Sequence, residues 1–292
     1  MSPGVLLKLG RVSNLPTVWT NTLAAIVLSG GTVIQGDSGS RTIGLMIAMS
    51  LAYIGGMYLN DAFDAEIDAE QRPERPIPSG AISRQAVYVA GFAMLAGCVV
   101  ILGYVGQSGP TGLWPAFGGL ALSAAIVVYD WYHKDNPLSP AFMGLCRALV
   151  YVAVGLVFTL ALPWPLLIAA ACMLCYIVGL TYAAKQESLG RVENMWPLAF
   201  LAIPWIYGLL LVIETPAATV YLLLFTIPIG IALRFLFRRG AGDVPKAVVT
   251  LIAGVALLDA VYLAGAGAFT WAATAVVLFG ITLTAQRYIP GT

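Results

Sequence analysis

Long apolar runs separated by short polar breaks recur along the whole 292-residue chain. Each run is about 18 to 22 residues long, which suffices for a helix to cross a hydrocarbon core of about 30 Å. Proline and glycine in three breaks predict tight turns, at residues 163–165, 214–216 and 265–267. The pattern predicts nine to ten spanning helices, because the uncharged stretch of the last run, Phe269 to Ala285, is at the lower limit for crossing. The predicted spans cover residues 13–35, 42–62, 84–106, 112–132, 140–162, 164–184, 195–213, 217–237, 246–265 and 268–286.

Composition supports a membrane protein. Hydrophobic residues make up 60% of the chain and charged residues 10%, whereas a soluble domain carries about 25% charged residues. The formal charge of +1 provides no global field to attract nucleic acid, so we expect membrane lipids and not nucleic acid as partners. The sequence therefore predicts an all-α, polytopic transmembrane bundle, with residues 1–292 forming one integral membrane domain.

The few charges are distributed unevenly between the two sets of loops. With a cytoplasmic N-terminus, Arg41 is the one basic residue that falls on the outer side, which is the asymmetry expected of a correctly oriented bundle. The acidic residues on outer loops are Asp37 and Glu214. We expect a multi-pass protein of a bacterial inner membrane, with both chain ends and the active face cytoplasmic. The active-face loops are about 63–83, 133–139 and 185–194.

A cluster of carboxylates follows the second run. Asn60, Asp64 and Asp68 are spaced i, i+4 and i+8, so they share one helical face, and Asp61 adjoins it. Like charges this close repel, which predicts a cation, and Mg²⁺ prefers such oxygen ligands together with substrate phosphates. Arg72 and Arg75 follow, and guanidinium groups complement phosphate oxygens.

These residues resemble the UbiA superfamily of intramembrane prenyltransferases. The resemblance rests on N-D-x-x-D-x-x-x-D from Asn60 to Asp68, on R-P-x-R-P-I-P-S-G from Arg72 to Gly80, and on the opening Arg11 to Trp19. It implies a helical bundle, usually of nine spans, that holds an isoprenyl diphosphate through Mg²⁺. It also implies ionisation of the diphosphate, attack by an acceptor on the carbocation, and metal and diphosphate contacts at Asn60, Asp61, Asp64 and Asp68.

The chain departs from this family in the loop after the sixth span. Members usually carry a second aspartate-rich motif there, but residues 182–194 contain no aspartate. Two interpretations stay open: Glu187 and Glu193 act as metal ligands, or Lys185 and Arg191 contact the diphosphate directly.

Other polar residues on the same face complete the candidate site. Tyr129 with Lys134 matches a family Tyr and Lys near the diphosphate, one residue longer than usual. His133 is either a base or, as we favour, an interfacial side chain. We assign Arg147 to the pocket because a guanidinium within a span needs a partner. Arg11 and Asn14 are candidates for acceptor binding.

The candidate residues fall into three groups, for catalysis, diphosphate binding and metal binding. We expect catalysis from Asp61, Asp64, Asp68, Lys134 and Tyr129, diphosphate binding by Asn60, Arg72, Arg75, Arg147, Lys185 and Arg191, and metal binding by Asn60, Asp61, Asp64, Asp68, Glu187 and Glu193. Asp259, in the middle of a span, should instead face the bundle interior and hydrogen-bond another helix.

The leading hypothesis is Mg²⁺-dependent transfer of an isoprenyl group from its diphosphate to a small aromatic or lipophilic acceptor. A terpene cyclase or diphosphate lyase of the same fold is an alternative, and so is a non-catalytic lipid-binding or transport protein. Transporters tend to place charged networks at the membrane midplane, whereas most charges here crowd one interface. The partners we expect are therefore an isoprenyl diphosphate and its acceptor.

Overall fold

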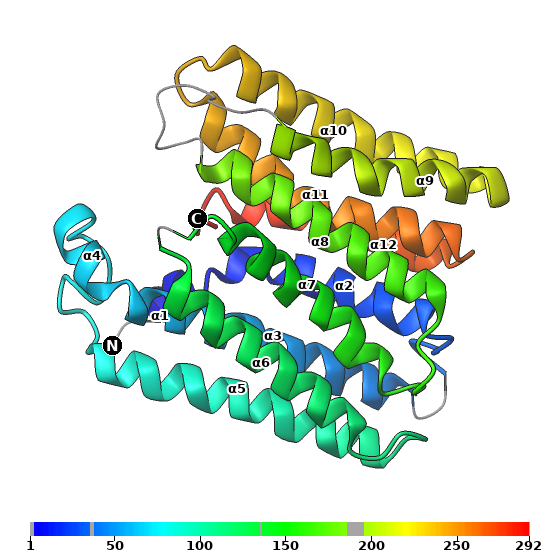
Figure 1. Cartoon of the computed structure of the whole chain (residues 1–292), viewed down its shortest axis with the longest axis horizontal. Coiled ribbons are helices and arrows are strands. Elements are labelled where there is room, and N and C mark those ends of the chain that lie inside the picture. The colour runs from blue at the N-terminus through cyan, green and yellow to red at the C-terminus, as the bar shows by residue number, and fades with distance from the viewer. Residues whose placement is uncertain (1–2, 36–37, 135, 186–195, 292) are drawn as a thin grey trace.

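The computed structural model describes residues 3–35, 38–134, 136–185 and 196–291. Within these ranges the regular structure is helical, and the long helices lie side by side in one bundle (Figure 1). The elements are α1 (Pro3–Leu9), η1 (Val12–Asn14), α2 (Leu15–Leu28), α3 (Ser38–Phe63), α4 (Ala65–Gln71), α5 (Arg84–Gln107), α6 (Trp114–Tyr132), α7 (Ser139–Gly155), α8 (Trp164–Lys185), η2 (Trp196–Leu201), α9 (Ala202–Glu214), η3 (Pro216–Ala218), α10 (Thr219–Arg238), α11 (Asp243–Gly265) and α12 (Phe269–Ala285).

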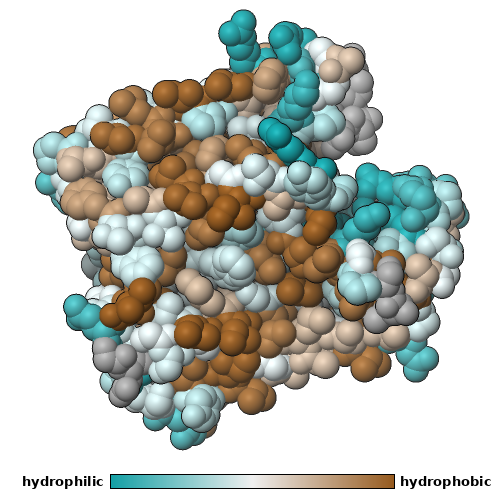
Figure 2. Space-filling view, turned by 180° about the vertical axis from the view of Figure 1, so that it is seen from behind, coloured by the Kyte–Doolittle hydropathy of each residue, from teal (hydrophilic) through white to brown (hydrophobic). Residues whose placement is uncertain are grey.

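The bundle has the surface of an integral membrane protein. Figure 2 shows hydrophobic side chains over much of the flank, while the strongly hydrophilic ones gather mainly toward one end. In the described part of the chain, six helical stretches are long and apolar enough to cross a membrane, namely α3, α5, α8, η2 with α9, η3 with α10, and α11. Helix α11 lies at the centre, packed against α2, α8, α10 and α12.

Every predicted run contains a helix, although several ends differ from the prediction. Helix α2 ends at Leu28 instead of residue 35, because the chain turns at Gly30 with a positive φ of 78°. Helix α7 ends at Gly155, short of the predicted residue 162. The predicted turn at 163–165 is wrong in part, since α8 begins at Trp164 and Pro165 fits its first turn, where no N–H partner is needed.

Helices α3 and α5 approach one another closely. A Cβ atom added to Gly55 would lie 2.9 Å from the carbonyl oxygen of Gly91, so a larger side chain would push the two backbones apart. Small residues allow such contacts between membrane helices. This contact helps to position the end of α3, which carries the carboxylate cluster.

Both chain ends lie at the end of the bundle that carries α4 (Figure 1). The Asn14 amide donates to the carbonyl oxygen of Gly291 at 3.0 Å, which joins the two terminal regions directly. The two terminal regions therefore lie together at one end of the bundle.

Candidate active site

The predicted carboxylate cluster lies where α3 passes into α4. The α-helix is interrupted at Asp64, but two backbone hydrogen bonds continue across the break. The backbone N–H of Asp64 donates to the carbonyl oxygen of Asn60 at 3.0 Å, and that of Asp68 donates to the carbonyl oxygen of Asp64 at 2.8 Å. These bonds keep the four-residue spacing across the interruption, so Asn60, Asp64 and Asp68 stay on one face as predicted. All three, and Asp61, are more than 90% buried instead of solvated.

Basic side chains neutralise the cluster from two directions. Arg75 contacts Asp61 at 3.3 Å and Asp68 at 2.9 Å. Arg11 reaches the same cluster from the N-terminal segment, at 3.3 Å from Asp61 and 3.4 Å from Asn60. Arg11, expected at the acceptor, therefore lies against the motif itself, some fifty residues away in sequence.

The segment after α6 supplies the third group of contacts. His133 Nε2 lies 3.4 Å and Lys134 Nζ 3.3 Å from one oxygen of Asp64, and the Tyr129 ring stacks on His133 at 5.1 Å. Burial alone would raise the pKa of Asp64, but the hydrogen bonds and charges of His133 and Lys134 outweigh it and lower that pKa. Asp64 is thus held ionised. His133, expected at the interface, instead belongs to this cluster.

A cavity of about 430 Å³ opens beside the cluster. Arg11, Arg72, Arg75 and Asp130 line it at the motif end. Its remaining wall is largely apolar and comes from α2, α3, α6, α7, α8 and α11, with Val18, Met49, Leu122, Ile126, Val150, Ile177, Leu180 and Val255 among the lining residues. Met49 precedes Asn60 by about three helical turns, so the apolar part extends deep along the bundle.

Arg147 lines the same cavity at an intermediate depth. Its guanidinium donates to Asn21 at 2.8 Å and to Thr17 at 3.0 Å, and lies over the ring of Tyr53. Tyr53 is seven residues before Asn60, or about 10 Å along α3. The prediction that Arg147 belongs to the pocket is consistent with this position.

Behind Arg147 lies a buried polar network. Asn21 also donates to Asp259 at 2.7 Å, and the Tyr151 hydroxyl donates to the other oxygen of Asp259. Asp259 is fully buried in α11. The prediction that it hydrogen-bonds another helix is confirmed.

The second predicted acceptor residue is already engaged. Asn14 donates to Gly291 and accepts from Gln286 at 2.6 Å, so both ends of its amide contact the C-terminal segment. Asn14 and Gly291 both line the cavity. The C-terminal segment therefore forms part of the cavity wall, which no local sequence signal indicates.

Several predictions fall outside the described residues. Glu187, Arg191 and Glu193 lie in the segment 186–195, and of Lys185 the structure describes the place at the end of α8 but not the side chain. Conversely, no predicted motif includes Asp130 or Asn21 as a functional residue. Both are polar residues within apolar runs, which is the signal that could have identified them.

The cluster offers carboxylate and amide oxygens, which are the type of ligand that Mg²⁺ prefers. Among the residues that the structure describes, no three Asp, Glu, His or Cys side chains are grouped so as to hold an ion by themselves. Mg²⁺ commonly takes one or two carboxylates and completes its shell with water and substrate phosphates. One oxygen of Asp130 is also buried without a hydrogen-bond partner. The cluster therefore fits a magnesium ion shared with a phosphate ligand.

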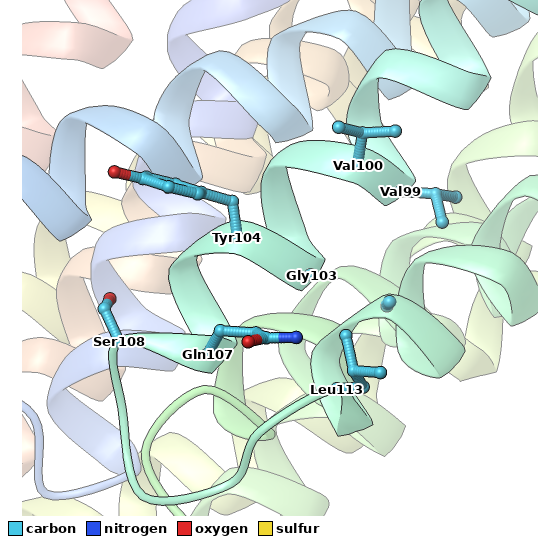
Figure 3. A pocket seen from close by; sticks show the side chains of 8 residues that line it. Val99, Val100, Gly103, Tyr104, Gln107, Ser108 and Leu113 are labelled. Atoms are coloured by element: carbon cyan, nitrogen blue, oxygen red, sulfur yellow. The ribbon is translucent and has the colours of Figure 1, made fainter.

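A second hollow lies between the end of α5 and the start of α6 (Figure 3). These helix ends lie away from α4, at the other end of the bundle (Figure 1). None of its eight lining residues bears a carboxylate, basic or thiol group. Tyr104 is 78% exposed there. We assign this hollow to the lipid-facing surface and not to the site.

Comparison with known proteins agrees with the geometry. A model of the UbiA prenyltransferase family matches residues 17–247. Digeranylgeranylglyceryl phosphate synthase of Methanopyrus kandleri is 28% identical over 81% of this chain and 84% of its own length. The same enzyme of Methanothrix thermoacetophila is 38% identical over 35% of this chain, a match that spans 38% of that enzyme. Chloroplastic chlorophyll synthase of Arabidopsis thaliana is 42% identical over 22% of the chain and 18% of its own length.

Solved structures share the fold. A structure of digeranylgeranylglyceryl phosphate synthase has a TM-score of 0.63 at 17% identity and covers 90% of this chain and 97% of its own. The apo structure of a UbiA homolog from Aeropyrum pernix K1 has a TM-score of 0.62, also at 17% identity, over 87% of this chain and 97% of its own. At this identity the likeness concerns the fold.

Proposed function

The chain belongs to the UbiA prenyltransferase family, and we propose that it transfers an isoprenyl group from an isoprenyl diphosphate to a small aromatic or lipophilic acceptor within the membrane. The observation that carries this proposal is the cavity, charged at the motif end and largely apolar beyond it. Such a cavity suits a ligand with an anionic head and a hydrocarbon tail. Its depth along α3 suits a tail that lies parallel to the helices.

The polar end would hold the diphosphate. Asn60, Asp61, Asp64 and Asp68 would hold Mg²⁺, which when bound neutralises the leaving diphosphate. Arg72 and Arg75 would donate to phosphate oxygens, since Arg75 contacts Asp61 and Asp68 through Nη1 alone and keeps its other N–H donors for the ligand. Lys134 contacts Asp64, Tyr129 stacks on His133 and lines the cavity, and both would stabilise the departing group. Glu187, Glu193, Lys185 and Arg191 remain proposed contacts of the same diphosphate.

The reaction then needs a dry cavity. The bond between the allylic carbon and the diphosphate oxygen breaks, pyrophosphate leaves, and the acceptor's nucleophile bonds to the allylic carbon and loses a proton. Side chains such as Met49, Leu122 and Ile126 keep water from capturing the carbocation. The ring of Tyr53 lies on the cavity wall, where it holds the guanidinium of Arg147 over its face.

The test is to incubate the purified protein with Mg²⁺ and isoprenyl diphosphates of several chain lengths, with and without a panel of acceptors. Because the relatives' names include a glyceryl phosphate and a chlorophyll product, the panel should contain a glyceryl phosphate lipid, a tetrapyrrole acid and a simple phenol. Pyrophosphate release and a prenylated product that require an acceptor support transfer. Release without an acceptor would indicate a cyclase or lyase, and no release at all would indicate a non-catalytic protein.

We also propose that the active face is cytoplasmic. The end of the bundle that carries α4 also carries the N-terminal segment, the loop after α6 and the turn between α10 and α11, which together hold most of the basic residues. Arg41 lies at the other end, where it donates to the Ser108 carbonyl. This distribution is the positive-inside asymmetry.

A further inference from the structure

Asp130 is the carboxylate at the cavity mouth whose bonding is incomplete. It is 3% exposed and lines the cavity. One oxygen, Oδ1, accepts a hydrogen bond from the Asn60 amide at 3.2 Å. The other, Oδ2, is buried without a partner. Because buried polar atoms in native proteins are nearly always paired, an unpaired carboxylate oxygen indicates a missing ligand.

The charges around the cluster indicate the sign of that ligand. Arg11 contacts Asp61, and Arg75 contacts both Asp61 and Asp68. His133 and Lys134 contact Asp64. Among the ion pairs of the described residues, Asp130 has none. A buried carboxylate without a counter-ion is strongly unfavourable, so the missing ligand should be a cation or a proton donor.

The geometry favours a metal ion over a protonated ligand group. The Asn60 amide fixes Oδ1, so Oδ2 is held in a defined direction at the mouth of the cavity. Asn60 also begins the motif of oxygen donors, so Asp130 adds a carboxylate to that set from a different helix, α6. Hard oxygen donors from two elements, with a basic rim for phosphate, are what a magnesium–diphosphate complex needs.

We propose that Asp130 Oδ2 is a direct ligand of the divalent cation, so that α6 and the α3–α4 segment hold the ion from two sides. This inference rests on the proposed function, because the ion is the one that accompanies the diphosphate. Asn60 then has a second role besides any contact of its own: it orients Asp130 through Oδ1. The sequence provides no spacing that joins residues 60 and 130, so the assignment depends on the packing of α6 against α3.

The test measures metal binding without turnover. The purified full-length protein, in the presence of a slowly reacting farnesyl thiolodiphosphate, is titrated with Mn²⁺ while electron paramagnetic resonance follows the free ion. Asp130→Asn preserves size and the contact with Asn60 but weakens a metal ligand, and should weaken Mn²⁺ binding by at least about tenfold. Glu66→Gln is the control, since Glu66 lies in the α3–α4 segment beside the motif aspartates but is exposed and paired with Arg84, and it should change binding less than about twofold.

A second variant covers the case in which Asp130→Asn fails to fold. Asp130→Cys introduces a soft ligand, so direct coordination predicts a preference for Cd²⁺ over Mn²⁺ that the wild type lacks. Wild-type Mn²⁺ affinity in Asp130→Asn, or an unchanged metal preference in Asp130→Cys, overturns the proposal. If Asp130→Asn loses turnover but keeps its affinity for Mn²⁺, the proposal is also overturned, and Asp130 would instead be assigned to binding of the acceptor. Absence of Mn²⁺ binding in the wild type would instead count against the proposed function itself.

Discussion

The buried network around Asp259 leads to a stability prediction that follows from the structure alone. Asp259→Leu removes the acceptor of two interhelical hydrogen bonds, from Asn21 and from Tyr151. One such bond in a membrane protein contributes about 0.6 kcal/mol and at most about 1.7. The Tyr151 hydroxyl also stays buried without an acceptor, at a cost of about 1 kcal/mol or more, whereas the Asn21 amide keeps a long contact of 3.5 Å with that hydroxyl. We expect the free energy of unfolding to fall by about 2–5 kcal/mol.

The assay is reversible unfolding of the purified protein in mixed micelles, read by circular dichroism. A double-mutant cycle sharpens it, because Tyr151→Phe removes the hydroxyl donor that Asp259→Leu leaves without an acceptor. The Tyr151→Phe/Asp259→Leu protein should therefore lose about 1 kcal/mol less than the sum of the two single changes. Glu66→Gln is the control, since its exposed ion pair with Arg84 contributes about 0–1 kcal/mol. Additive losses, or an Asp259→Leu cost no larger than the control's, would refute this account of the network.

Three further predictions concern the site and the topology. Changing any one motif aspartate (Asp61, Asp64 or Asp68) to Ala should lower Mg²⁺-dependent pyrophosphate release at least about 100-fold, with unchanged size-exclusion elution; wild-type rates would disprove the metal assignment. Changing both Glu187 and Glu193 to Gln should sharply raise the Mg²⁺ concentration needed for half-maximal turnover, whereas an unchanged requirement would leave the diphosphate contact to Lys185 and Arg191. Alkaline phosphatase fused after Thr292 should be silent, because the C-terminus is expected in the cytoplasm; an active fusion would contradict the even number of crossings.

Local sequence patterns determined the helices and much of the polar face. In a hydrocarbon environment each backbone group must be paired within its own segment, so an apolar run of sufficient length becomes a helix whatever lies beside it. The same local logic placed Asn60, Asp64 and Asp68 on one face. Helix ends were less accurate, as α2 and α7 show, because a turn such as that at Gly30 depends on backbone conformation that hydrophobicity does not report.

The partners of those residues were decided by the tertiary structure. Arg11 meets Asp61 across fifty residues, Asn60 meets Asp130 across seventy, and Asn21 meets Asp259 across 238. A helix repeats its own geometry every few residues, so spacing reveals which side chains share a face. Which face of one helix meets which face of another depends on the packing of small residues and side-chain volumes along the whole bundle. That is why the sequence could identify the carboxylates of the motif, while the fold was needed to find the carboxylate that stands opposite them.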